Sequence, residues 1–298
     1  MTENDSHDFA ARFHARFRRV LEFIDAHIDE PLPLERLSEV AAFSKFHFQR
    51  QFTELYTMGV YQYVQLLRLN RAAHRLAYRE QLSIMRIAQD AGYDGAESFA
   101  RAFRRKLGQS PSEFREAPDW NSWQSIKNPL HQLRSEHMAL SHTAEDVSIV
   151  EFTTTRVAAL EHRGAPDRLG DSIRKFIDWR KQNRLSPRVS ATFNIAYDDP
   201  ELTEAAQFRF DICAATDEEV APNSHGIISK VIPGGRCAKL RHVGSEATLG
   251  HAIRYLYARW LPASGEEPRD YPLFMQRVLF FPDVAEHEAV TDLFLPLK

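Results

Sequence analysis

The sequence of 298 residues contains only two cysteines, Cys213 and Cys237, and they lie in separate apolar segments. A small secreted fold held by disulfides needs several paired cysteines, so that class of protein is excluded and a reducing cytoplasm suits the chain. We expect both thiols to be packed in the interior rather than to act in redox chemistry or metal binding.

Long apolar runs are also missing. No stretch approaches the roughly 20 apolar residues that cross a bilayer, and the first residues are acidic and polar, unlike a secretory signal. We therefore expect no membrane partner and a cytoplasmic location. Hydrophobic residues make up 43% and charged residues 27% of the chain, which is ordinary for a globular protein. The length predicts roughly two domains.

The net charge of −3 is small and does not by itself favour nucleic acid as a partner. Its distribution is uneven, because residues 45–106 hold eleven Lys or Arg against five Asp or Glu, which gives +6 there and −9 elsewhere. A basic region joined to an acidic remainder is expected where one part of a protein meets phosphate. The alternative is a solvated, charged helix surface.

Residues 44–56 have the pattern of a capped amphipathic helix. Ser44 can accept a hydrogen bond from the amides of the first turn, and an apolar stripe follows at i, i+4 and i+7. The stripe consists of Phe48, Phe52 and Leu55. An amphipathic segment, 34–41, precedes this helix through a tight turn at Ala42 and Phe43. Helix, short turn and capped helix with polar side chains outside is typical of a DNA-reading helix-turn-helix.

The same pattern returns later in the chain. Residues 87–93 align with 37–43 at an offset of 50, and five positions from Phe99 to Phe114 align with positions from Phe48 to Tyr63 at an offset of 51. The sequence therefore predicts a tandem helix-turn-helix. A long helix over 60–78 is expected to join the two motifs. A single apolar stripe also predicts a helix over 9–29.

Two such motifs on one stiff helix can place two recognition helices in successive major grooves, about 34 Å apart, as a monomer. Arg and Gln suit bidentate contacts with base edges, a Glu can accept from cytosine, and a Phe can pack on a thymine methyl. We predict base contacts from Phe46, Gln49, Arg50, Glu97, Ser98 and Arg101. We predict phosphate contacts, which add affinity without sequence choice, from Lys45, Arg104, Arg105 and Lys106. The alternative for each residue is an ordinary exposed position on a helix.

Residues 30–117 resemble the DNA-binding domain of the AraC/XylS family of bacterial regulators. The signature is clearest in the second motif: Ile87-Ala88, Ala91-Gly92-Tyr93, Phe99, Phe103, Gly108, Ser110-Pro111 and Phe114-Arg115. Residues 44–50 are similar to the first recognition helix of the monomeric Mar/Sox/Rob branch. The resemblance implies an all-α domain of seven helices, double-stranded DNA near promoters as partner, RNA polymerase as a candidate contact, and a location at the nucleoid.

Two positions depart from this pattern. Ala42 and Thr57 stand where the second motif has Gly92 and Gly108. If these backbones need a positive φ, each side chain costs on the order of 1 kcal/mol.

Residues 118–146 lose clear periodicity, and we expect a linker there with at most one weak helix. We therefore predict a multi-domain chain: a DNA-binding domain over 1–117, the linker over 118–146, and a second domain over 147–298.

The second domain contains a duplication. Nine residues from Arg156 to Arg174 recur from Arg236 to Arg254 at an offset of 80, and each half reads strand, glycine turn, amphipathic helix and two strands. The two helices are expected at about 168–184 and 247–261. The sequence thus predicts an α+β domain of two βαββ repeats, with a small-molecule groove between them.

This unit resembles the GyrI-like effector-binding domain. The matching segments are Tyr197–Pro200, Ile232–Arg236, Arg241–Gly244 and Trp260–Pro262. A DNA reader followed by a GyrI-like domain is the arrangement of Rob-type regulators, so the resemblance implies a small-molecule effector. Cation-binding members carry a glutamate in the penultimate strand, where this chain has Met275, so a lipophilic cation is not carried over as the ligand.

Alternation along the strands places three residues of the penultimate strand on one face. With their expected repeat mates at an offset of 82, we predict an effector groove lined by Phe193, Ile195, Tyr197, Met275, Arg277 and Leu279. An arginine there favours an anionic or neutral polar effector. The alternative is that Arg277 pairs with an internal carboxylate or reaches solvent.

No Gly-x-Ser-x-Gly motif, metal-ligand spacing or helically paired carboxylates are present. The sequence therefore predicts no catalytic residues, no cofactor and no metal site, and favours a sequence-specific transcription regulator modulated by a small molecule. Two alternatives stay open. One is an enzyme with hydrolase-like activity in the GyrI-like fold, and the other is a protein that sequesters a ligand or a partner, with DNA binding serving only as targeting.

Overall fold

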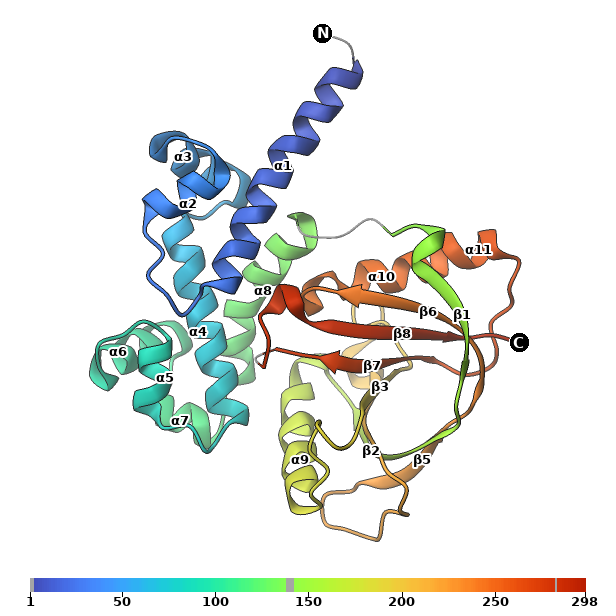
Figure 1. The fold of residues 1–298 in the computed structure, drawn as a ribbon. Helices are drawn as coiled ribbons and strands as arrows, with labels where there is room; N and C mark the ends of the chain where they lie inside the picture. The colour runs from blue at the N-terminus through green and yellow to red at the C-terminus, as the bar shows by residue number, and fades with distance from the viewer. Residues whose placement is uncertain (1–2, 138–141, 282) are drawn as a thin grey trace. The chain divides into compact units, whose positions relative to one another are not determined.

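The structure is a computed structural model that describes residues 3–137, 142–281 and 283–298 (Figure 1). The chain forms two compact units. Unit 1 comprises residues 1–139 together with 285–287, and unit 2 comprises the remainder.

Unit 1 is all-α, as predicted. Its helices are α1 (Glu3–Ala26), α2 (Leu34–Ala41), α3 (Lys45–Tyr56), α4 (Val60–Tyr78), α5 (Ile84–Asp90), α6 (Ala96–Leu107), α7 (Pro111–Glu116) and α8 (Trp120–His137). The predicted apolar stripes meet in one hydrophobic core, in which Phe17, Phe48, Phe52, Phe99 and Phe103 are almost fully buried. Each motif thus supplies a pair of phenylalanines that fixes its second helix.

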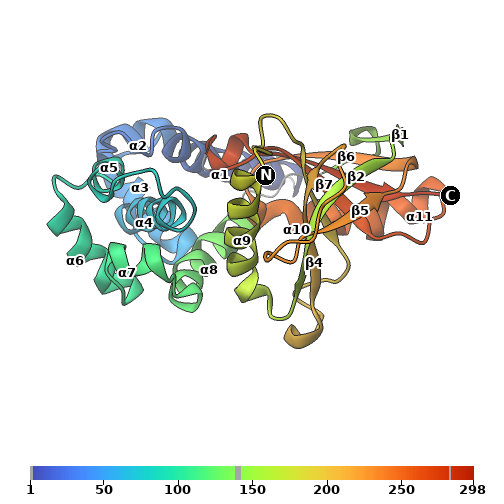
Figure 2. The same cartoon turned by 90° about the horizontal axis from the view of Figure 1, so that it is seen from below.

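Helix α4 joins the two motifs. It contacts α3, α5, α7 and α8, and it buries residues on more than one side, as its sequence predicted. Figure 2 shows α5, α6 and α7 grouped beside α4. A helix shared in this way makes the two motifs parts of one core rather than separate modules.

The turns of the first motif adopt left-handed conformations without glycine. Ala42 has φ 55° and Thr57 has φ 53°, while Gly92 and Gly108 have φ 80° and 75°. The expected departure from the second motif is therefore real, and the first motif carries backbone strain that the second avoids.

The segment expected to be a linker contains a long helix. Helix α8 has 18 residues, contacts α4 and α6, and buries side chains that include Trp123, Ile126 and Leu133. The indole N–H of Trp123 donates to the side-chain oxygen of Asn70 on α4, at 2.8 Å. Pro129 inside the helix obscured its period in the sequence, because proline in a helix interior normally marks a break.

Unit 2 is a single eight-stranded antiparallel sheet, strongly curled in Figure 1. Its strands are β1 (Val147–Phe152), β2 (Thr155–Arg163), β3 (Thr192–Ala196), β4 (Arg209–Ala215), β5 (Ile228–Ile232), β6 (Gly235–Val243), β7 (Leu273–Leu279) and β8 (Val290–Pro296). The order is β1-β6-β8-β7-β3-β4-β2-β5. The two predicted repeats are β2-α9-β3-β4 and β6-α10-β7-β8, and they meet at β3 and β7. Helix α9 spans Leu169–Gln182, and α10 (Leu249–Tyr255) continues through a π-helical turn into α11 (Leu261–Ser264).

The two faces of this sheet have different cores. On one face, α9 covers a cluster that includes Leu160 and Ile212, and α10 covers a second cluster that includes Leu240 and Leu293. The opposite face holds a third cluster, into which Phe152 of the edge strand β1 packs. Its ring centroid lies 4.7 Å from that of Phe274 and 5.2 Å from that of Phe294. The curl of the sheet thus brings an edge strand over the face that the helices leave open.

In the described part of the chain, no helix is both long enough and apolar enough to cross a membrane.

Candidate nucleic-acid interface and effector face

The first recognition helix, α3, is oriented by its cap and its core. The side-chain oxygen of Ser44 accepts a hydrogen bond from the backbone N–H of His47, at 3.4 Å. Phe48 and Phe52 are buried in the core, and this rotation of the helix turns Gln49 and Arg50 outward. The residues predicted to contact bases on this helix are all exposed: Phe46, Gln49 and Arg50. Phe46 is 86% exposed, which is unusual for a large apolar side chain and indicates a partner surface.

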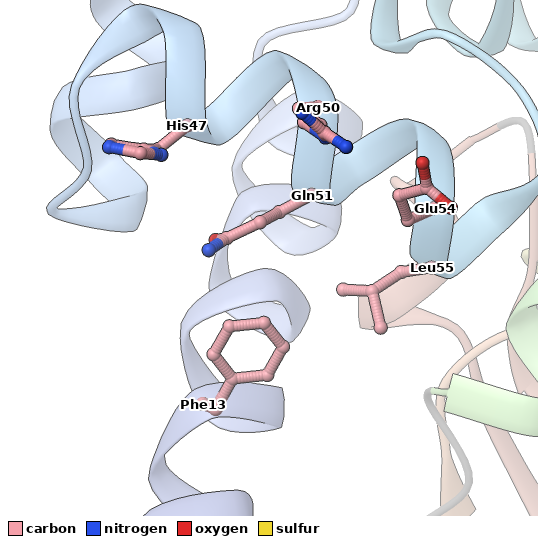
Figure 3. A pocket seen from close by; sticks show the side chains of 6 residues that line it. All are labelled: Phe13, His47, Arg50, Gln51, Glu54 and Leu55. Carbon is pink, nitrogen blue, oxygen red and sulfur yellow. The ribbon is translucent and has the colours of Figure 1, made fainter.

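A pocket of about 430 Å³ lies beside this exposed face, between α3 and α1 (Figure 3). Its lining residues are Phe13, His47, Arg50, Gln51, Glu54 and Leu55. Arg50 therefore borders both the pocket and the surface predicted to meet DNA. The side-chain oxygen of Gln51 is buried and has no hydrogen-bond partner among the described residues. Sequence reasoning did not single out His47 and Gln51, although both neighbour Arg50 on a helical turn.

The second recognition helix, α6, presents an equivalent face. Phe99 and Phe103 are buried, while Glu97 and Arg101 are exposed. Ser98 is half-buried and its hydroxyl donates to the carbonyl of Gly95, at 2.9 Å, so it can offer a base only its acceptor lone pairs. The residues predicted to contact phosphate form the exposed last turn of this helix: Arg104, Arg105 and Lys106.

The two recognition helices lie on the same outer side of unit 1 in Figure 1. On the first of them, Lys45 is exposed and pairs with Glu35 of α2, at 2.7 Å. Side chains this exposed gain little from pairing, so Lys45 remains available to a phosphate.

The effector residues predicted on unit 2 do not share one face. In the register of the central strands, Asn194 lies opposite Met275 and Ile195 lies opposite Phe274. Directly opposed residues of an antiparallel pair point to the same side of the sheet. Met275 therefore belongs to the core under α10, whereas Phe193 and Ile195 belong to the core on the opposite face. The prediction that these residues line one groove together was therefore wrong.

The cause is an offset wrong by one residue. His162 and His242 hold equivalent positions at an offset of 80, but Phe193 and Phe274 hold equivalent positions at 81, not at the expected 82. A slip of one residue in a strand moves every side chain to the other face.

The remaining residues of that set are also divided. Tyr197 follows Ile195 on the face opposite the helices, and its hydroxyl donates to Asp211, at 2.8 Å. Arg277 is half-buried and forms an ion pair with Glu246, whose side chain is 58% exposed and is therefore not an internal carboxylate. Leu279 is exposed near the end of its strand.

Comparison with known proteins assigns the second unit. A family model for the GyrI-like small molecule binding domain matches residues 145–298, which is more than half of the chain. The chain belongs to the GyrI-like family. A helix-turn-helix domain model matches residues 37–117, ahead of the GyrI-like domain.

Two curated relatives match parts of the chain that differ in length. The probable transcriptional regulator YgiV of Escherichia coli K12 is 40% identical over 153 residues, which are 51% of this chain and 96% of YgiV. The regulatory protein SoxS of Salmonella typhimurium is 35% identical over 96 residues, which are 32% of this chain and 89% of SoxS. Among solved structures, an EcmrR–DNA complex covers 89% of this chain and 98% of that one, with 12% identity and a TM-score of 0.44.

The two family models and the curated relatives confirm the predicted architecture. The protein is a transcription regulator in which an AraC-type helix-turn-helix domain precedes a GyrI-like domain.

One charged network stabilises the GyrI-like domain on the face away from its helices. Asp211 is fully buried and accepts hydrogen bonds from Lys230 at 2.6 Å, Tyr197 at 2.8 Å and Arg163 at 3.2 Å. Burial alone would lower the pKa of Lys230, but its hydrogen bonds to Asp211 and Glu161 raise that pKa above the ordinary value. Tyr197 is therefore held by the domain's own residues, which makes it a poor candidate for an effector contact.

Proposed function

We propose that this regulator reads two successive major grooves as a monomer, through α3 and α6, and that a small molecule bound by its GyrI-like domain modulates DNA binding. Base contacts are assigned to Phe46, Gln49, Arg50, Glu97, Ser98 and Arg101. Phosphate contacts are assigned to Lys45, Arg104, Arg105 and Lys106.

The observation that carries this proposal is that three polar side chains on the two helices are exposed and, in the part of the chain that the structure describes, unpaired. Gln49, Arg50 and Arg101 are exposed, and within the described residues their side chains have neither an ion pair nor a hydrogen bond. They sit on equivalent helices whose rotation is fixed by buried phenylalanines in one core. Donors held ready on a rigid support suit bidentate recognition of base edges.

The same observation disfavours the alternatives. An enzyme or a sequestering protein that binds DNA only as targeting would not need two helices that each present exposed side chains for base recognition. We therefore propose that the protein is not an enzyme, that it acts in the cytoplasm at the nucleoid, and that RNA polymerase is a further partner. The last point rests on the family resemblance.

The test is recovery of genomic fragments by the full-length protein. The double variant R50A/R101A should lose specific recovery while keeping its far-ultraviolet spectrum and melting temperature, because both residues are exposed. The control variant R259A removes an exposed arginine of the GyrI-like domain and should recover the same fragments as the unmodified protein. Unchanged recovery by the double variant would refute the assignment of these helices.

A further inference from the structure

Arg180 of α9 is a buried cation with only neutral partners. Its side chain is 6% exposed. It donates to the carbonyls of Leu185 at 2.5 Å and Ser190 at 2.8 Å, and to the hydroxyl of Thr192 at 2.7 Å. No carboxylate pairs with it among the described residues. Burial lowers the pKa of Arg180 to about 10, so the side chain is still charged at neutral pH.

Thr192 connects this cation to the centre of the sheet. Thr192 of β3 lies directly opposite Arg277 of β7, so their side chains share the helix-bearing face, with Cβ atoms about 5 Å apart. The next pair along the same face is Asn194 and Met275. We call Arg180, Thr192, Asn194 and Arg277 the polar row.

The polar row lies between residues of two apolar cores, and Phe210 packs against both cores. One core lies under α9 and includes Phe176, and the other lies under α10 and includes Leu256. Small-molecule sites combine apolar walls with a few polar groups that fix orientation. The row therefore lies at the point where the two repeats meet and where such a combination is available.

The only carboxylate paired with the row in the described structure is replaceable. Glu246 pairs with Arg277, but the Glu246 side chain is 58% exposed while that of Arg277 is 14% exposed. An ion pair with one solvated partner contributes little, so a better-placed anion can displace Glu246. The amide nitrogen of Asn194 lies 3.4 Å from the carbonyl of Asp211, a long contact that leaves it able to donate elsewhere.

Resting on the proposed function above, we propose that the polar row is the recognition element of the effector site and that the effector is an amphipathic anion. A carboxylate, sulfonate or phosphate takes the place of Glu246 on Arg277 and offsets the buried charge of Arg180, while its apolar body packs between the two cores. Two charges interact more strongly in a partly buried site than in water. A lipophilic cation would have to sit beside two guanidinium groups, with Met275 in place of a carboxylate.

The probe is 8-anilino-1-naphthalenesulfonate, an apolar anion, compared with tetraphenylphosphonium, an apolar cation. Affinities of the full-length protein are measured by calorimetry. The sulfonate should bind the unmodified protein, and R277Q should weaken it at least tenfold. R277K, which keeps the charge, should weaken it less, and E246Q, which frees Arg277, should tighten it several-fold. The matched control R156Q removes an exposed arginine at the start of β2 and should leave the affinity unchanged. Thermal melting of every variant excludes probe binding to unfolded protein.

Three results would overturn the proposal. If R277Q and R156Q bind the sulfonate equally well, the polar row does not recognise it. If the phosphonium binds and the sulfonate does not, the site takes cations, and the proposed effector function survives without this ligand class. If neither probe binds, the anion site fails, and the effector function must then be tested independently by measuring DNA binding in the presence of cell extracts freed of protein.

Discussion

His162 and His242 hold equivalent positions in the two repeats, but their ring nitrogens do not have equivalent partners. The Nδ1 atom of His162 lies 2.9 Å from the hydroxyl of Ser172, and its Nε2 atom lies 3.2 Å from the carbonyl of Ala165. The first hydrogen bond links the end of β2 to α9, and the second links it to the loop that leads into α9. His162 is thus fully satisfied inside the domain.

In the described structure, His242 retains the contact of its Nε2 atom with a backbone carbonyl but not the contact of its Nδ1 atom with a hydroxyl. Its Nε2 atom lies 3.2 Å from the carbonyl of Ser245, matching His162, but its buried Nδ1 atom has no partner among the described residues. Ala252 stands at the position equivalent to Ser172, at the same offset of 80. The second repeat has therefore lost a hydroxyl that the first repeat uses.

Restoring this hydroxyl should stabilise the GyrI-like domain. We expect A252S to raise the free energy of unfolding by up to about 1 kcal/mol, because it supplies a donor to a buried acceptor. The reciprocal variant S172A should lower it by about 1–3 kcal/mol, since it leaves the His162 nitrogen unsatisfied. Urea denaturation of both variants measures the difference. A lower stability for A252S would mean that the site around residue 252 has no room for an oxygen atom.

The same histidine should make stability depend on pH. Burial lowers the pKa of His242 and outweighs the hydrogen bond to the carbonyl of Ser245, which raises it, while His142 and Arg277 lower the pKa further. The unfolded chain, with a histidine pKa of about 6.5, then binds a proton more readily than the folded domain, so acid favours unfolding. Stability contributed by neutral His242 is present above about pH 6.5 and is lost as the pH falls below it, by at most about 1.4 kcal/mol per pH unit. H242Q should flatten this slope between pH 6.5 and 5, and an unchanged slope would assign it to other groups.

The left-handed turns of the first motif offer a further test. A42G and T57G should each stabilise the protein by about 1 kcal/mol, because glycine accepts a positive φ that alanine and threonine resist. The reverse change G108A is the matched control, since an added Cβ there meets nothing within 4 Å and isolates the backbone effect. Thermal melts should show opposite shifts for T57G and G108A.

Sequence patterns predicted the helical unit more accurately than the sheet unit, for physical reasons. In the tandem motifs, a buried pair such as Phe48 and Phe52 fixes the face of a helix, and an error of one residue in the alignment changes that face only partly. In a strand the period is two, so the same error reversed the side of Phe193 and Ile195. Helix α8 was expected only as one weak helix in a linker, because Pro129 lies inside it and the segment shows no clear period. The loss of a partner for His242 could have been read from the alignment of Ser172 with Ala252.

The two classes of predicted DNA contact should differ in how salt and sequence affect them. Replacing Arg101, assigned to a base edge, by alanine should cost about 1–3 kcal/mol on a specific site and little on unrelated DNA. Replacing Arg105, assigned to phosphate, should weaken both kinds of DNA alike and reduce the slope of log affinity against log salt by about 0.9. Fluorescence anisotropy measures the affinity for both kinds of DNA at salt concentrations of about 50–300 mM. The comparison separates a loss of sequence preference from a change in salt dependence. The opposite result would be that R105A lowers the ratio of specific to unrelated binding while R101A changes only the salt slope. In that case the exposed last turn of α6 reads the sequence, and the middle of the helix does not.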